Sequence, residues 1–356
     1  MLDGFGGPLR PDLLYVVLCG PGVGESVAVR VPPDGWVIVD SLRVGPEPGA
    51  FLAGRSVVST FGGRLAGLVL THPHSDHADG FSDLVEALAD GFVGCVRVYV
   101  EPPPGWKDDV NLDRLRKRQG VADALSSIGS RWNRVTDSRW EMTARSRQTV
   151  NDAVFEALYP SEEALARFKR APPSDDNRLS SPVRVTWGDL RVILGGDLVR
   201  VGWNEIADMP LAPSVADHHC YKVAHHGSLG AQHDVVLVGS LDRTWCIAPF
   251  RSSLLPRFED EEGVDQLLRK IEQVHLTSLP YDAHPEPNPP RRVTRDQARQ
   301  RQVPGPPAID IGAGRTAIPV SAPKRAPMAW IAAGFARSGR LDDIRHGPLA
   351  AVVREG

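Results

Sequence analysis

The sequence LVLTHPHSDHADG runs from Leu68 to Gly80. An apolar run with strand character ends at Thr71, and a helix-like spacing of apolar residues begins at Phe81. The positions between them hold three imidazoles and a carboxylate, at His72, His74, Asp76 and His77. Clustered groups of this kind need partners, and they are ligands that divalent metals accept. The stretch therefore predicts a metal-binding loop between a strand and a helix.

Three other apolar runs also end in histidine or aspartate. WVIV is followed by Asp40, RVILGG by Asp197, and YKVA by His225 and His226. Ligand sites in α/β folds gather at the carboxyl ends of strands. We therefore expect these side chains to meet the HPHSDH loop at one edge of the protein, and the alternation of strand and helix patterns favours α/β layers.

The spacing within the loop allows two ion positions. His72 and His74 can reach one ion, whereas Asp76 and His77 lie past the bend and face a neighbouring position. Asp197 could bridge the two, and two ions ~3.5–4 Å apart can share a hydroxide. The predicted ligands of one or two ions are His72, His74, Asp76, His77, Asp197 and His225. This ligand set favours Zn²⁺, with Mn²⁺ as the alternative.

The roles of the remaining polar residues follow from strand geometry. If the strand YKVA continues through them, His225 and His226 point to opposite sides of the chain. We predict that His225 binds metal and that His226 faces the substrate, where it could protonate a leaving group. Asp76 is the other candidate for moving a proton. Asp40 is expected to order the loop through hydrogen bonds without binding metal.

Four segments resemble the metallo-β-lactamase fold superfamily, and within it the soluble hydrolase domain of the ComEC/Rec2 DNA-uptake proteins and their stand-alone bacterial relatives. They are GPGVGESVAVRVPPDGWVIVDS (20–41), LTHPHSDHADG (70–80), DDNRLSSPVRVTWGDLRVILGGDL (175–198) and YKVAHHGS (221–228). The resemblance implies a four-layer αβ/βα sandwich with the metals at one edge. It also implies hydrolysis by a hydroxide that a dinuclear metal centre activates.

The sequence departs from the family pattern in two places. The superfamily usually has another histidine before the bridging aspartate, but no histidine occurs between His77 and His218. Asp176, Asn177 or water could fill that ligand position. PFRSSLLPRF (249–258) also lacks the histidine that ComEC-type domains often carry after HHGS.

Composition limits the partners and the compartment. The net charge is −3, so any contact with nucleic acid needs a local basic patch. The cluster RLRKR (114–118) is either such a patch or a solvated helix face. Scattered cysteines and the absence of an apolar span or signal peptide predict a cytoplasmic protein that does not contact a membrane. Candidate substrate-binding residues are Lys222, His233, Arg114, Arg116 and Lys117.

We expect a hydrolase-like domain over 1–281, an irregular Pro/Arg-rich segment over 282–325, and strands within 326–356 that complete the same domain. The middle segment contains HPEPNPPRR and VPGPP, a composition that argues against a packed core. Just before it, GVDQLLRKIEQV predicts a helix over 263–274.

Three functions remain open at this point. The leading hypothesis is a metal-dependent phosphodiesterase or nuclease acting on a nucleic acid or nucleotide. The second is hydrolysis of a small ester, lactone or amide by the same centre. The third is a non-catalytic or regulatory metal-binding protein with a protein partner, as in bacterial defence systems. Metal content without turnover of any phosphodiester would favour the third.

Overall fold

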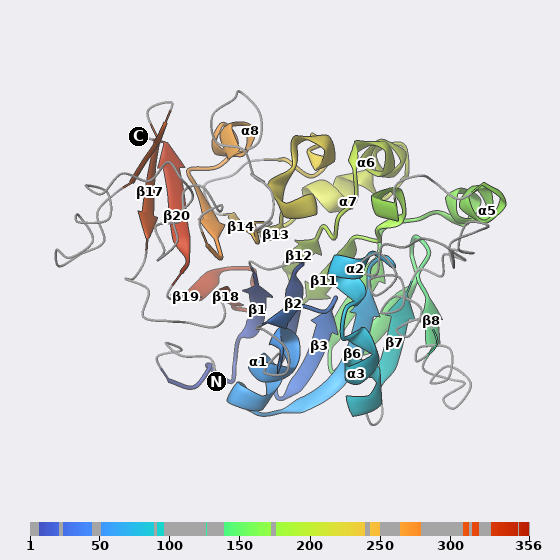
Figure 1. Cartoon of the computed structure of the whole chain (residues 1–356), viewed down its shortest axis with the longest axis horizontal. Helices are drawn as coiled ribbons and strands as arrows, with labels where there is room; N and C mark the ends of the chain where they lie inside the picture. The colour runs from blue at the N-terminus through green and yellow to red at the C-terminus, as the bar shows by residue number, and fades with distance from the viewer. Residues whose placement is uncertain are drawn as a thin grey trace, which may run out of the picture.

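The computed structural model of the chain describes residues 7–20, 24–44, 51–88, 91–95, 126, 139–171, 176–238, 243–249, 264–278, 309–312, 315–319, 329–347 and 349–355. Two large sheets form the centre of the molecule, and helices cover their outer faces (Figure 1). The α/β sandwich predicted from the sequence is therefore confirmed.

The first sheet has eight strands. In spatial order they are β19 (Leu341–His346), β18 (Trp330–Phe335), β1 (Leu14–Cys19), β2 (Ser26–Val31), β3 (Gly35–Val39), β6 (Arg64–Leu70), β7 (Phe92–Cys95) and β8 (Arg139–Glu141). Helices α1 (Ala53–Phe61) and α3 (Phe81–Ala87) lie on its outer face, with the short α2 (Ser75–Ala78) between β6 and α3. A separate two-stranded ribbon joins β4 (Arg43–Val44) to β5 (Phe51–Leu52).

The second sheet has ten strands. Their order is β16 (Ile309–Gly312), β17 (Arg315–Pro319), β20 (Ala351–Glu355), β15 (Gln273–Leu276), β14 (Thr244–Ile247), β13 (Cys220–Lys222), β12 (Leu190–Leu194), β11 (Val183–Trp187), β10 (Ala153–Ala157) and β9 (Arg147–Val150). The helical segments of this half are α5 (Glu162–Arg170), η2 (Asp176–Leu179), α6 (Arg200–Ala207), α7 (Ala212–Ala216), η3 (His225–Gly227), η4 (Leu229–Ala231) and α8 (Val264–Leu268).

Strand β1 shows why the layers form. Every residue of this strand is buried, which is typical of a strand covered on both faces. Leu14 and Leu18 belong to the core shared with the second sheet, whereas Tyr15 and Val17 belong to the core that also contains Val57 of α1. Successive side chains of a strand point to opposite faces, so β1 supplies both cores.

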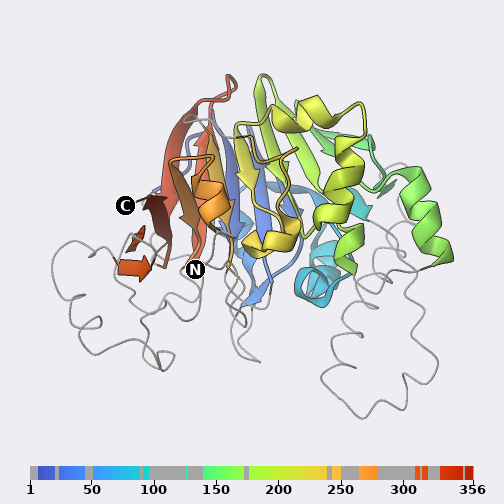
Figure 2. The ribbon, with the colours of Figure 1, turned by 90° about the horizontal axis from the view of Figure 1, so that it is seen from above.

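The C-terminal part of the chain returns to both sheets. Strand β18 pairs antiparallel with β1, and β20 pairs with β15. The strands at the two ends of the sequence consequently lie side by side (Figure 2). Strands β16 and β17 lie inside the 282–325 segment that we expected to be irregular, and β17 pairs with β20.

One predicted helix is only partly present. The pattern of residues 263–274 indicated a continuous helix, but α8 ends at Leu268 and the buried strand β15 begins at Gln273. The QVHL segment pairs with β14 and β20, so tertiary packing overrides the helical periodicity there. Within the described ranges, no helix has both the length and the apolar composition that a membrane crossing requires.

The topology brings the polar strand ends together. Strands β3 and β6 run parallel, with Val39 opposite Val69, and β12 and β13 run parallel, with Leu194 opposite Lys222. Their carboxyl ends carry the polar residues identified in the sequence. These side chains meet at the edge between the two sheets.

Candidate metal centre

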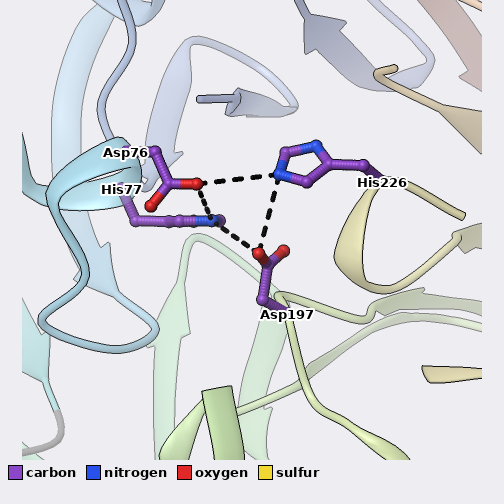
Figure 3. A group of neighbouring side chains, drawn as sticks. All are labelled: Asp76, His77, Asp197 and His226. Carbon is purple, nitrogen blue, oxygen red and sulfur yellow. Dashed lines mark ion pairs between the residues drawn. The ribbon is translucent and has the colours of Figure 1, made fainter. Parts of the chain in front are cut away.

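Four buried side chains form the centre of the site. They are Asp76 and His77 from α2, Asp197 from the turn after β12, and His226 from η3 (Figure 3). Each offers one ligand atom, and the four atoms all lie within 4.8 Å of one another. Asp197 Oδ2 is 3.2 Å from His77 Nε2 and 3.6 Å from His226 Nε2. Asp76 Oδ2 is 3.8 Å from each of the same two nitrogens.

These separations fit a single divalent ion. Metal–nitrogen and metal–oxygen bonds of ~2.0–2.2 Å give a ligand–ligand edge of ~3.3–3.6 Å in a tetrahedral site. The separations between the histidine nitrogens and the carboxylate oxygens run from 3.2 to 3.8 Å. Moreover, the buried atoms His77 Nε2 and Asp197 Oδ1 have no well-aligned hydrogen-bond partner in the described part of the chain. Two imidazoles and two carboxylates suit Zn²⁺ and Mn²⁺ alike.

Two hydrogen bonds aim the histidines at the cluster. His77 Nδ1 donates to Asp40 Oδ2 at 2.8 Å, and Asp40 also accepts from the backbone N and the hydroxyl of Thr71, both at 2.8 Å. His226 Nδ1 donates to the carbonyl of Ala248 at 2.9 Å. Each bond leaves Nε2 facing the carboxylates, because a partner on one ring nitrogen sets which nitrogen is available to a metal.

The backbone around the cluster is strained. Asp40, His225 and His226 have φ of 59°, 49° and 54°, in the left-handed region that is costly for residues other than glycine. Such conformations persist only where the surroundings over-determine them, and they gather at functional sites. Gly196, at φ 52°, provides the turn that carries Asp197.

Charge dominates the titration of the cluster. Burial lowers the pKa of His77, but the carboxylates of Asp197, Asp40 and Asp76 outweigh it and raise that pKa well above the usual range. Burial acts to raise the pKa of Asp197, yet His77 and His226 hold it well below the usual range. Burial also acts to raise the pKa of Asp76, but the nearby His77 outweighs it, and that pKa is lowered. The clustered carboxylates therefore give the site a strong preference for a cation.

A buried ion pair lies beneath the cluster, and sequence reasoning missed half of it. Lys222 and Glu25 are each 1% exposed and form an ion pair, and Lys222 Nζ also donates to the carbonyl of Gly196 at 2.9 Å. Glu25 Oε2 is 3.6 Å from His226 Nδ1, and Lys222 Nζ is 4.0 Å from Asp197 Oδ1. Lys222 was predicted to bind substrate, but its ammonium is buried in the ion pair with Glu25.

The loop before β2 brings Glu25 to the centre. Gly24 has φ of 134°, and a Cβ there would lie 1.8 Å from the carbonyl oxygen of Asp76. Only glycine allows the two loops to approach this closely. A glutamate directly before an apolar strand was the available signal, because a charge at that position needs a partner.

The assignment of the paired histidines is reversed relative to the prediction. His226 belongs to the cluster, whereas His225 lies beside Asn177, with 3.2 Å between His225 Nε2 and Asn177 Nδ2. The prediction assumed a strand through both residues, but β13 ends at Lys222 and the chain turns through η3. Since both histidines are in the left-handed conformation, strand alternation does not apply to them.

The predicted first ion position contains an amide. His72 Nε2 lies 3.1 Å from Oδ1 of Asn177, whose amide thus lies between His72 and His225. His74 has 45% of its side chain exposed, and its Nδ1 is 2.6 Å from Asp76 Oδ1. Asp176 begins η2, and its side chain lies outside the described part of the chain.

His233, another predicted contact, is not among the four residues of the cluster. His233 is half-buried in the loop after η4, where its Nδ1 accepts from the backbone N of Val235 at 3.0 Å. Arg114, Arg116 and Lys117 lie outside the described residues.

Comparison with known proteins identifies a family. The model of the metallo-β-lactamase superfamily matches residues 19–232, a range that contains all four residues of the cluster. A comparison with curated proteins found no match.

Three solved structures illustrate the structural similarity. CmlA, a diiron β-hydroxylase from Streptomyces venezuelae, is 14% identical with a TM-score of 0.35, over 62% of this chain and 36% of CmlA, so the match spans about a third of that protein. MEM-A1, a subclass B3 metallo-β-lactamase from a soil metagenome, is 13% identical with a TM-score of 0.35, over 61% of this chain and 79% of MEM-A1. Zn²⁺-bound PqqB from Methylobacterium extorquens is 12% identical with a TM-score of 0.33, over 58% of this chain and 71% of PqqB.

Proposed function

Because this chain belongs to the metallo-β-lactamase superfamily, we propose that it is a metal-dependent hydrolase that cleaves phosphodiester bonds of a nucleic acid or nucleotide. The observation that carries the metal dependence is the buried group of Asp76, His77, Asp197 and His226, whose ligand atoms lie within 4.8 Å of one another. The preference for a phosphodiester is supported by the sequence resemblance to ComEC-type domains. We propose Zn²⁺ as the ion, with Mn²⁺ as the alternative.

The four residues of the cluster would hold the ion, and their neighbours would keep them in place. A divalent ion at this position would supply Lewis-acid activation of water and would offset the negative charge that develops on the substrate. Asp40 fixes the ring of His77 through its hydrogen bond to Nδ1. The carbonyl of Ala248 does the same for His226. Both rings are thereby held ready, so that little reorganisation is needed when substrate binds.

His74 is half exposed, so a substrate that approaches the centre from solvent can contact its imidazole. Its Nδ1 contacts Asp76 Oδ1 at 2.6 Å, and this hydrogen bond raises the pKa of His74. A protonated imidazole at the rim of the centre can donate a hydrogen bond to a phosphate oxygen or a proton to a departing alkoxide. From the sequence, His226 or Asp76 was predicted to move the proton; both belong to the cluster, and we propose His74 for this role in their place.

The test is a hydrolysis screen of metal-replete protein. The substrates are single-stranded DNA, double-stranded DNA, RNA, bis(p-nitrophenyl) phosphate and p-nitrophenyl acetate. We expect cleavage of at least one phosphodiester, loss of that cleavage on chelation, and its return with Zn²⁺ or Mn²⁺. Asp197→Asn should abolish the activity, whereas His233→Ala, outside the cluster, should keep it.

The remaining hypotheses correspond to other outcomes of the same screen. Hydrolysis of p-nitrophenyl acetate alone would contradict a phosphodiesterase and support small-ester hydrolysis. Bound metal without turnover of any substrate would contradict a hydrolase and leave a regulatory protein with a protein partner.

A further inference from the structure

We infer that the centre of this chain holds one ion, and that an array of His72, Asn177 and His225 takes the place of the second ion that the HPHSDH spacing predicts. This inference rests on the proposed metal centre and specifies how many ions it takes. Within the described ranges, the groups of three or more metal-type ligand atoms include neither His72, His74 nor His225.

The ring nitrogens of His72 are both engaged. Nδ1 is 3.0 Å from the hydroxyl oxygen of Thr71, and Nε2 is 3.1 Å from Oδ1 of Asn177. Because the Thr71 hydroxyl gives its one hydrogen to Asp40, it accepts from Nδ1 of His72, and Nε2 keeps the lone pair. With the amide of Asn177 turned so that its nitrogen faces His72, that lone pair accepts an amide hydrogen. The lone pair of Nε2 is thereby used by Asn177.

The same amide reaches His225 from its other end. Asn177 Nδ2 is 3.2 Å from His225 Nε2, so one side chain connects two imidazoles that could otherwise bind metal. Asn177 is buried, as is His72, so an amide with these partners is held in a fixed position. Both ends of the Asn177 amide therefore have an imidazole partner, as a buried amide requires.

The ligand chemistry at the second position is also unsuitable. Zn²⁺ takes thiolate, imidazole and carboxylate ligands, whereas Asn177 offers an uncharged amide. His74 directs Nδ1 at Asp76 Oδ1, at 2.6 Å. Asp197, the expected bridge, directs Oδ2 at the cluster and has Oδ1 4.0 Å from the ammonium of Lys222. Two divalent ions ~3.5–4 Å apart need shared anionic ligands, and the carboxylate oxygen that faces this side, Asp76 Oδ1, is already in contact with His74 Nδ1.

The test counts ions in wild-type protein and in Asn177→His, which supplies an imidazole where the array has an amide. Chelator-stripped protein is reconstituted with Zn²⁺, freed of loose metal by gel filtration and measured by elemental analysis. We expect about one ion per chain in the wild type and about two in Asn177→His. Asn204→His is the matched control, since it adds an imidazole at an exposed position of α6, and it should keep one ion.

A second readout needs no variant. Wild-type protein loaded with Mn²⁺ should give the electron paramagnetic resonance spectrum of isolated ions at every metal-to-protein ratio. An exchange-coupled spectrum, or two tightly held Zn²⁺ per chain in the wild type, would overturn the inference and leave the proposed hydrolase in place. One ion in a folded Asn177→His would overturn the role given to Asn177. No bound metal at all would overturn both the inference and the proposed function.

Discussion

Replacing Lys222 by methionine should destabilise the protein strongly, although the substitution keeps most of the side-chain volume. Lys222 and Glu25 are buried together, and the lysine also donates to the carbonyl of Gly196. Without the ammonium, Glu25 would be a buried carboxylate close to the Asp197 carboxylate. Breaking a buried ion pair at one partner costs ~3–5 kcal/mol. Because ~1.4 kcal/mol is a tenfold change, the unfolding equilibrium constant should rise by ~10²–10⁴-fold.

The assay is urea unfolding of metal-free protein, and two further variants make it decisive. Lys222→Met combined with Glu25→Gln removes both charges and should recover most of the loss, since an apolar replacement of a whole buried pair is often neutral. Arg167→Met breaks an ion pair with Glu205 in which the arginine is half exposed, and should cost ~0–1 kcal/mol. A single Lys222→Met variant as stable as Arg167→Met, or a double variant no better than the single, would refute the reasoning.

The remaining predictions concern the centre itself. Asp76→Ala should lower single-turnover cleavage by at least ~100-fold, because the terms that a metal centre supplies are each worth several kcal/mol, while filter binding of the oligonucleotide should change little. Asp40→Asn should weaken Zn²⁺ binding ~10–100-fold by calorimetry, since the hydrogen bond that orients His77 is weakened. The pKa of His77 is raised in the metal-free fold. The stability that protonated His77 contributes is therefore complete below its ordinary pKa of ~6.5 and declines as pH rises through the raised value. Chemical denaturation in chelator across pH should show that decline, and Zn²⁺-loaded protein should not show it. Arg116→Ala with Lys117→Ala should flatten the salt dependence of oligonucleotide binding if those side chains meet phosphates, and an unchanged slope would remove them from the substrate path.

The strand ends were the most predictable part of the site. HPHSDH follows an apolar run, and local spacing together with ligand chemistry was enough to predict a metal-binding loop there. Asp40 and Asp197 could be added because parallel strands bring their carboxyl ends to a common edge. The structure places both within 3.2 Å of a ring nitrogen of His77.

The features that sequence reasoning missed depend on long-range packing or on backbone conformation. Glu25 and Lys222 are separated by 197 positions, so the local pattern at Glu25 could signal that the charge needs a partner but could not identify that partner. His226 rather than His225 joins the cluster, because the backbone leaves the strand in a left-handed turn. The helix expected over 263–274 stops where the chain adds β15 between two neighbouring strands. In each case the outcome depends on how distant segments pack, which the local pattern does not contain.

The most direct test of the metal centre is anomalous diffraction at the zinc absorption edge, from crystals grown with Zn²⁺. A single-ion centre should give one strong anomalous peak enclosed by Asp76, His77, Asp197 and His226, with the amide of Asn177 still between His72 and His225. A peak bound by His72 and His74, or no peak near Asp197 in fully loaded crystals, would contradict it.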